Sequence, residues 1–197
     1  MVGRPTNRDE RYRQVMEALV RSVARYGLDG ASLSQIAKEA GLTRPLIRHH
    51  IGNREDMIAA LTGFVLESFD DQTQALVASL PKEKPSTALI DVLFSDSSVS
   101  EPDMVLAFAA LTARAADDAK LRNRCRKTLL DFEEAVADTL RRDHSGTDDA
   151  ALRAAAHGIT ALYFNLTSLA PLDMPPAWKT QAARVARNLL EELDTPT

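Results

Sequence analysis

The chain has 197 residues, of which 45% are hydrophobic and 26% charged, and it carries a net charge of −4 at pH 7. This composition is ordinary for a soluble globular protein, and the length allows one large core or a small module beside a larger domain. The single cysteine excludes an intrachain disulfide framework. We expect no signal peptide and no membrane partner, because no apolar run is long enough to span a bilayer, and hence a cytoplasmic protein.

The charge is divided unevenly along the chain. Residues 1–54 contain ten Lys or Arg and five Asp or Glu, a net +5, whereas residues 55–197 carry a net −9. A basic head on an acidic body concentrates attraction for phosphate at one end. The charge pattern therefore favours two functional parts, residues 1–54 and residues 55–197, with nucleic acid bound by the first.

Residues 32–51 have the pattern of a helix-turn-helix, preceded by a helix over about residues 9–26. Ser32 and Gln35 are spaced for a reciprocal capping box, and Gly41 suits the left-handed residue that ends a helix. Thr43 is placed to cap the next helix. Two short helices at this spacing are typical of a motif whose second helix enters the DNA major groove.

The second helix of this motif has a basic outer face. Its apolar residues should face inward, which leaves outside Arg44, Pro45, Arg48 and His49. Arg44 and Arg48 are four residues apart and project from one face, so each can read a guanine edge. For Arg48, contact with a phosphate is an equally good interpretation.

Beyond the motif, apolar periodicity predicts only helices. They are a long helix capped by Asn53 and further helices over about residues 86–94, 101–116, 120–142, 149–169 and 176–193. Residues 101–116 are apolar nearly all round and predict a central buried helix. Cys125 lies between two arginines, which would favour a reactive thiolate, but its place on the inner stripe of its helix predicts an inert buried thiol.

Residues 15–57 resemble the N-terminal domain of the tetracycline-repressor (TetR) family of bacterial regulators. The residues in register include Ile36-Ala37, Ala40-Gly41-Leu42 and Gly52-Asn53-Arg54-Glu55. The resemblance implies an all-α fold of about nine helices, in which a three-helix helix-turn-helix domain is joined through a long fourth helix to a helical ligand-binding and dimerisation domain. The family usually has Tyr at position 48 and Phe at position 51, so its usual tyrosine–phosphate contact is not preserved here.

The motif and the resemblance together predict a DNA-binding surface. Its members are Ser32, Ser34, Thr43, Arg44, Pro45, Arg48, His49, His50, Arg54 and Arg4. Arg54 and Ser32 should hold the phosphate backbone beside helix N-termini. His50 is either a phosphate contact, as the family often has, or a packed core histidine. Arg4 lies in Gly3-Arg4-Pro5, which resembles the core of a minor-groove arm or is simply part of a disordered terminus.

Two apolar stripes occupy the last two predicted helices. Their residues are Leu152, Ala155, Ile159, Leu162 and Leu166 in one helix and Trp178, Ala182, Val185 and Leu189 in the other. They either complete the core of one subunit or form a four-helix interface between two subunits. The resemblance favours a homodimer, because a helix-turn-helix normally works as a two-fold pair on a palindrome.

A small-molecule effector is implied by the resemblance rather than by any motif. The candidate ligand-binding residues, each also a candidate core residue, are Phe94, Phe108, Thr112, Phe132, Val136 and Tyr163. Residues 103–142 resemble the subgroup that contains choline-responsive betaine regulators, although few aromatics surround Phe108 to form a cation-binding cage. We expect no metal site and no cofactor, because the four histidines lack partners at ligand spacing and no phosphate or dinucleotide motif is present.

The sequence thus favours a DNA-binding transcriptional regulator over an enzyme, since no catalytic constellation occurs in the helical body. The hypothesis is a homodimeric repressor that binds a palindromic double-stranded DNA operator and is released by a small-molecule effector. The alternative is a helical protein that sequesters small molecules or acts as a scaffold, without a role in gene regulation.

Overall fold

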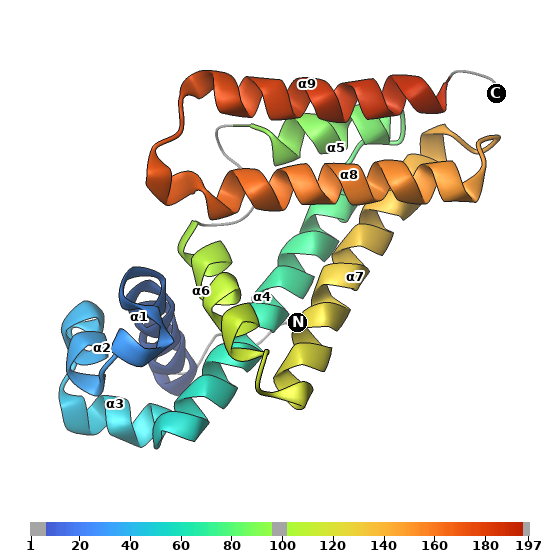
Figure 1. Cartoon of the computed structure of the whole chain (residues 1–197). Helices are drawn as coiled ribbons and strands as arrows, with labels where there is room; N and C mark the ends of the chain where they lie inside the picture. The colour runs from blue at the N-terminus through green and yellow to red at the C-terminus, as the bar shows by residue number, and fades with distance from the viewer. Residues whose placement is uncertain (1–6, 96–101, 195–197) are drawn as a thin grey trace. The chain divides into compact units, whose positions relative to one another are not determined.

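The computed structural model describes residues 7–95 and 102–194. Over these residues the chain forms nine α-helices and one 3-10 helix and no strand (Figure 1), which confirms the all-α expectation. The helices are α1 Asn7–Gly30, α2 Leu33–Ala40, α3 Arg44–Ile51, α4 Arg54–Ser79, α5 Pro85–Leu93, α6 Pro102–Arg114, α7 Ala119–Asp143, α8 Asp149–Ser168, η1 Ala170–Leu172 and α9 Pro176–Leu193. The predicted Gly3-Arg4-Pro5 arm and most of the polar segment 95–100 lie outside the described residues.

The chain divides into two compact units. Unit 1 comprises Met1–Ser68 and Asp103–Cys125, and unit 2 comprises Phe69–Pro102 and Arg126–Thr197. Helices α1 to α3 belong to unit 1, and α5, α8 and α9 belong to unit 2, whereas α4 and α7 each begin in unit 1 and end in unit 2. No helix formed by the described residues is both long and apolar enough to cross a membrane.

The capping box and the glycine turn predicted for unit 1 are both present. The Ser32 hydroxyl accepts a hydrogen bond from the Gln35 amide at 3.2 Å, and the Ser32 amide donates to the Gln35 side chain at 2.9 Å. Gly41 ends α2 with φ of 63°, a left-handed conformation that glycine adopts without cost. The Gln14 side chain donates to the Ala40 carbonyl at 2.8 Å, which ties α1 to the end of α2.

Unit 1 agrees with one sequence prediction and differs from another. The regular part of α1 ends at Tyr26 as predicted, because Gly27 has a non-helical backbone with φ of 72°, and a short helical segment continues from there to Gly30. α6 is not buried all round, because Ala109 and Thr112 are exposed while Phe108 and its neighbours face inward. Alanine is apolar but small, so it is compatible with an exposed helix face as well as a buried one.

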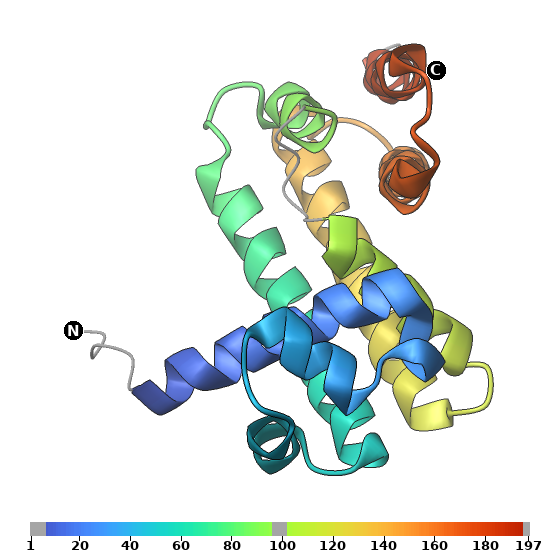
Figure 2. The ribbon, with the colours of Figure 1, turned by 90° about the vertical axis from the view of Figure 1, so that its left-hand side faces the viewer.

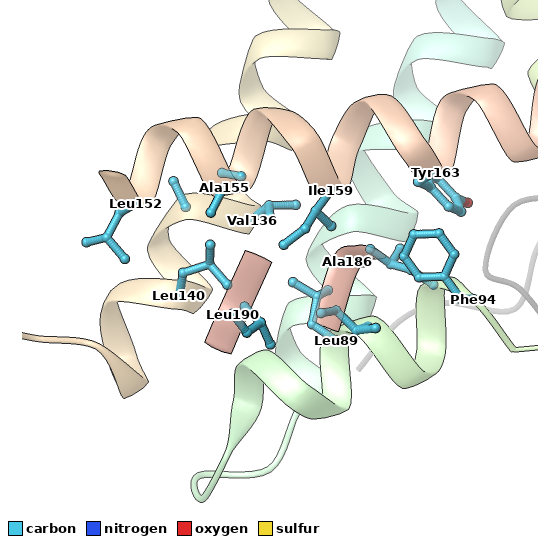
Figure 3. Packing of buried hydrophobic residues seen from close by; sticks show 14 of the residues in the cluster. Leu89, Phe94, Val136, Leu140, Leu152, Ala155, Ile159, Tyr163, Ala186 and Leu190 are labelled. Carbon is cyan, nitrogen blue, oxygen red and sulfur yellow. The ribbon is translucent and has the colours of Figure 1, made fainter. Parts of the chain in front are cut away.

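Unit 2 is held by a continuous apolar core. α8 and α9 run antiparallel and side by side (Figure 1), and Figure 2 shows them nearly end on. α9 also packs on α5. The helices approach closely at Gly158, where an added Cβ would lie 2.8 Å from a Leu189 methyl group. The core seen in Figure 3 includes Leu89, Phe94, Val136, Leu140, Leu152, Ala155, Ile159, Tyr163, Ala186 and Leu190.

This core revises the predicted dimer interface. Leu152, Ala155 and Ile159 are only 3%, 4% and 0% exposed and lie among the labelled core residues of Figure 3. Their side chains complete the core of one chain, so they are not available to a second chain. The other members of the two stripes are half-buried or exposed, namely Leu162, Leu166, Trp178, Ala182, Val185 and Leu189.

Candidate nucleic-acid interface

Helix α3 presents a basic face to solvent because its two isoleucines are buried on the opposite side of the helix. Ile47 and Ile51 are 0% and 3% exposed and anchor the helix in unit 1. The four residues predicted to lie outside are all exposed: Arg44, Pro45, Arg48 and His49. Since α3 has eight residues, these side chains cover most of its solvent-facing surface.

The start of α3 is simpler than predicted. Thr43 occupies the N-cap position with extended backbone angles, but its side chain accepts no capping hydrogen bond, so the predicted side-chain cap is wrong. Pro45 in the first turn needs no amide partner, which reduces the demand for a cap. The exposed Thr43 hydroxyl is therefore not committed to the helix.

The start of α4 is fixed by Asn53, as the sequence predicted. The Asn53 side-chain oxygen accepts hydrogen bonds from the Glu55 amide at 2.8 Å and the Asp56 amide at 3.0 Å. The Asn53 amide in turn donates to the Asp56 carboxylate at 3.1 Å. This reciprocal cap fixes the start of α4 directly after α3.

Arg54 has an intramolecular partner that the sequence did not indicate. Its Nη2 atom lies 2.6 Å from an Asp29 carboxylate oxygen and donates to the Leu28 carbonyl at 3.1 Å. The pair fastens the last turn of α1 to the first turn of α4. Arg54 remains about half exposed, at 49% of its side chain, and both of these contacts use its Nη2 atom.

Three predicted DNA-binding residues meet at one hollow of about 280 Å³. This α2–α4 hollow lies where α2 begins, α3 ends and α4 begins, and it is lined by Ala31, Ser32, Leu33, Arg48, Gly52, Asn53, Arg54 and Met57. Two guanidinium groups and the N-terminal amides of α2 give the hollow a positive potential. Such an arrangement suits an oxyanion of the size of a phosphate.

The remaining predicted residues have distinct environments. His50 is half-buried, and its ring meets the exposed His49 ring edge to face at 5.6 Å between centroids. Ser34 is exposed in the first turn of α2. Arg4 lies outside the described residues.

The predicted ligand-binding residues fall into two groups. Phe108 is buried and Thr112 exposed on the part of α6 that belongs to unit 1. The other four residues belong to the core of unit 2 or pack against it: Phe94, Phe132, Val136 and Tyr163. There the ring centroids of Phe132 and Tyr163 lie 5.8 Å apart. The ring centroid of Phe164, a residue that the sequence did not indicate, lies 5.9–6.0 Å from both.

Cys125 is buried at 4% exposure, in agreement with an inert thiol. Burial raises the pKa of the Cys125 thiol, and this effect exceeds the opposing influence of Arg124. A thiol with a raised pKa forms little thiolate at neutral pH. The two flanking arginines therefore do not make this cysteine reactive.

Comparison with known proteins supports the same surface. Residues 15–61 match the family described as bacterial regulatory proteins, tetR family. The chain is 30% identical over 112 residues to the HTH-type transcriptional regulator PksA of Bacillus subtilis, covering 55% of each, so it spans about half the length of that relative. It is 24% identical over 196 residues to the HTH-type transcriptional regulator BetI of Burkholderia mallei, covering 96% of each.

Solved structures share the fold. A protein from Saccharomonospora viridis, solved in complex with choline, superposes with a TM-score of 0.69 at 19% identity and covers 92% of this chain and 96% of its own. The matched residues 15–61 include all of α2 and α3 and the start of α4, and so contain the exposed basic face and the α2–α4 hollow. Over residues 15–61 the chain therefore matches the tetR family of bacterial regulatory proteins, and over most of its length it shares the fold of the protein from Saccharomonospora viridis.

Proposed function

We propose that the chain is a homodimeric repressor that binds a palindromic operator through α3 and is released by a small-molecule effector. The observation that carries this proposal is the composition of α3. The helix is anchored by two buried isoleucines, and it exposes two guanidinium groups and an imidazole. A short helix of this kind can enter a major groove without rearrangement of its core.

The two arginines of α3 have different expected roles. Arg48 lines the α2–α4 hollow with Arg54 and Ser32, and this shared position favours a phosphate contact for all three. Arg44 does not line that hollow and is exposed in the first turn of α3. We assign base reading to Arg44, supported by His49 and Pro45 on the same exposed surface.

A second copy of the chain is the expected partner of α8 and α9. Trp178 and Val185 are 38% and 44% exposed on α9, although both are large apolar residues. The same two apolar stripes also contain four half-buried residues: Leu162 and Leu166 on α8, and Ala182 and Leu189 on α9. Two helices from each subunit would bury these side chains in a four-helix interface.

We assign effector binding to the part of the chain after residue 54, and within it to the surroundings of the Phe132, Tyr163 and Phe164 rings. Choline is the first compound to test, because the structurally similar protein from Saccharomonospora viridis was solved with it. α4 is one continuous helix from Arg54 to Ser79, so a displacement of its C-terminal part is transmitted along its axis to Arg54. Effector and operator would then weaken each other reciprocally.

Selection of bound duplexes from a random DNA pool tests the proposal. We expect a palindromic consensus whose half-site centres are separated by about one helical turn or a multiple of it. The affinity for this consensus should fall steeply as salt is raised, since phosphate contacts release counterions. Arg184→Ala, an exposed arginine of α9 outside the matched residues, serves as the control and should select the same consensus.

An asymmetric consensus bound by a single chain would overturn the homodimer. Enrichment of no sequence at any salt concentration, with the purified protein folded, would overturn operator binding by the free protein. If choline and other tested small molecules bind the protein without changing its operator affinity, release by these effectors is excluded.

A further inference from the structure

A pocket of about 330 Å³ lies within unit 1, apart from the α2–α4 hollow. Its walls are the first turns of α4, the end of α6 and the start of α7. Its volume is at the lower end of the range for small-molecule sites. None of the residues predicted to bind DNA or an effector lines it.

Three cations line this pocket. Arg114 comes from the last turn of α6, and Lys120 and Arg124 come from the first turns of α7. Among the described residues, none of the three forms a hydrogen bond or an ion pair. They therefore remain available to an anion.

The placement of Lys120 and Arg124 is unfavourable for the isolated helix. They are four residues apart, so they repel each other on one face of α7, and both lie near a helix N-terminus, where the dipole disfavours cations. Arg122, on the same stretch, has a structural role, because it donates to the Ala115 and Ala116 carbonyls at the end of α6 at 3.2 and 3.0 Å. No such role accounts for the two cations of the pocket.

The pocket also contains two carboxylates and an apolar wall. Asp118 caps α7 by accepting a hydrogen bond from the Leu121 amide at 3.0 Å, and Glu55 is exposed in the first turn of α4. With three cations and two carboxylates the lining has a net charge of +1, which a single negative charge neutralises. The apolar wall is formed by Ile58, Ala59 and Leu121.

We infer that this pocket binds a small amphipathic monoanion, an organic acid whose charged group meets Arg114, Lys120 and Arg124 and whose hydrocarbon part lies against α4. Charge-assisted hydrogen bonds to guanidinium groups supply specificity for the acid group. Burial of the hydrocarbon part on the apolar wall adds affinity in proportion to the area removed from water.

The position of the pocket suggests a regulatory role, which rests on the proposed DNA binding. The pocket is lined by residues of α4 from Glu55 onward, directly after Arg54. Arg54 lines the α2–α4 hollow and is paired with Asp29. A ligand that contacts this part of α4 is therefore expected to change the affinity for operator DNA.

Calorimetric titration of the full chain with octanoate tests the binding step without DNA. We expect saturable binding of one octanoate per chain, and binding of octan-1-ol, which has the same chain length and no charge, at least about tenfold weaker. The double substitution Arg114→Ala/Arg124→Ala should weaken octanoate binding at least about tenfold. Arg184→Ala, which removes an exposed arginine elsewhere, should leave it within about twofold of the parent protein.

Equal affinity for octanoate and octan-1-ol, or unchanged octanoate binding in the double variant, would overturn the inference. Inorganic phosphate that binds the parent protein as tightly as octanoate, and whose binding is lost in the double variant, would also overturn it, because the apolar wall would then contribute nothing. Phosphate binding that the double variant retains belongs to the α2–α4 hollow and is not counted. Circular dichroism of each variant verifies folding, and Lys120→Gln replaces the double variant if that variant is unfolded. If octanoate binds as expected but operator affinity does not respond, the binding site stands and only its regulatory role fails.

Discussion

α3 and the pair α8 and α9 each bury an apolar stripe on their inner side, but the side chains on their outer sides differ in kind. α3 exposes Arg44, Arg48 and His49, whereas α9 exposes Trp178 and Val185. Apolar periodicity alone gives the same prediction for both, namely an amphipathic helix. The residues left outside separate them, since cations suit phosphates and bases, and large apolar side chains suit a second protein surface.

Removing the basic face of α3 should have the largest effect. We predict that Arg44→Glu/Arg48→Glu lowers operator affinity at least about 100-fold, because it removes two charged contacts and adds repulsion from phosphates. Fluorescence anisotropy with the selected duplex measures this, and circular dichroism should show an unchanged fold, since both side chains are exposed. Arg184→Glu, with a single reversal on α9, is the control for net charge. An equal loss of operator affinity in that control would show that the change in overall charge, and not the loss of the α3 contacts, is the cause.

Removing the support beneath that face should cost stability. Ile47 is fully buried, so Ile47→Ala is predicted to lower the free energy of unfolding of the part that contains it by about 2–5 kcal/mol. Urea denaturation followed by circular dichroism measures the loss. Leu130→Ala serves as the control, since Leu130 is 54% exposed, and should change stability by less than about 0.5 kcal/mol. Equal losses in the two variants would contradict the burial that orients α3.

Placing a charge on the apolar face of α9 should separate the subunits. Val185→Asp is predicted to raise the dimer dissociation constant at least about tenfold, because an unpaired carboxylate would be buried at the interface. Sedimentation equilibrium measures the constant. Arg184→Asp, at the adjacent exposed position, is the matched control and should have the smaller effect. A parent protein that is monomeric at all concentrations would refute the proposed role of this face.

Ser32 allows the helix cap and the phosphate contact to be separated. Ser32→Ala removes the capping box and should lower stability by about 1 kcal/mol. Ser32→Asp keeps a capping oxygen and should preserve stability, but its carboxylate would repel a phosphate in the α2–α4 hollow and lower operator affinity. Ser32→Asp with unchanged operator affinity would show that no phosphate occupies this hollow.

The smallest effect is expected from an exposed ion network between α7 and α8 that includes none of the residues assigned to DNA binding or to the subunit interface. Hydrogen bonds from Arg153 and Arg141 lower the pKa of Glu134, and hydrogen bonds from Arg141 and Arg153 lower the pKa of Asp149. Because both pKa values are depressed in the folded state, their stabilisation is present at neutral pH and is lost as pH falls below the ordinary carboxyl range. Thermal melts between pH 7 and about pH 3 should show a shallower decline in Arg153→Ala than in the parent protein. An identical decline would show that the exposed network contributes nothing.

The sequence predicts the local features of unit 1 well and the tertiary features poorly. The Ser32–Gln35 box, the turn at Gly41 and the Asn53 cap depend on residues within a few positions of each other, so their spacing is sufficient. The partnership of Arg54 with Asp29 joins positions 25 residues apart and depends on how α1 meets α4. No local pattern contains that information.

The same distinction explains the errors in unit 2. The sequence places Ile159 and Leu162 on one stripe of α8, but only the packing of α9 and α5 decides that Ile159 is 0% exposed and that Leu162 is left half-buried. The sequence likewise identified Phe132 and Tyr163 as candidates but missed Phe164. Adjacent residues on a helix point in different directions, so no local pattern predicts that the Phe132 ring lies close to both Tyr163 and Phe164.

The most direct test of the account is the base preference of Arg44→Ala, measured at every position of the selected operator and compared with the parent protein. We predict that the variant loses discrimination at one base pair in each half-site, at symmetric positions, and keeps it elsewhere. A uniform loss of affinity across all sequences, with every base preference retained, would show that Arg44 contacts only the phosphate backbone and would contradict the assignment of base reading to α3.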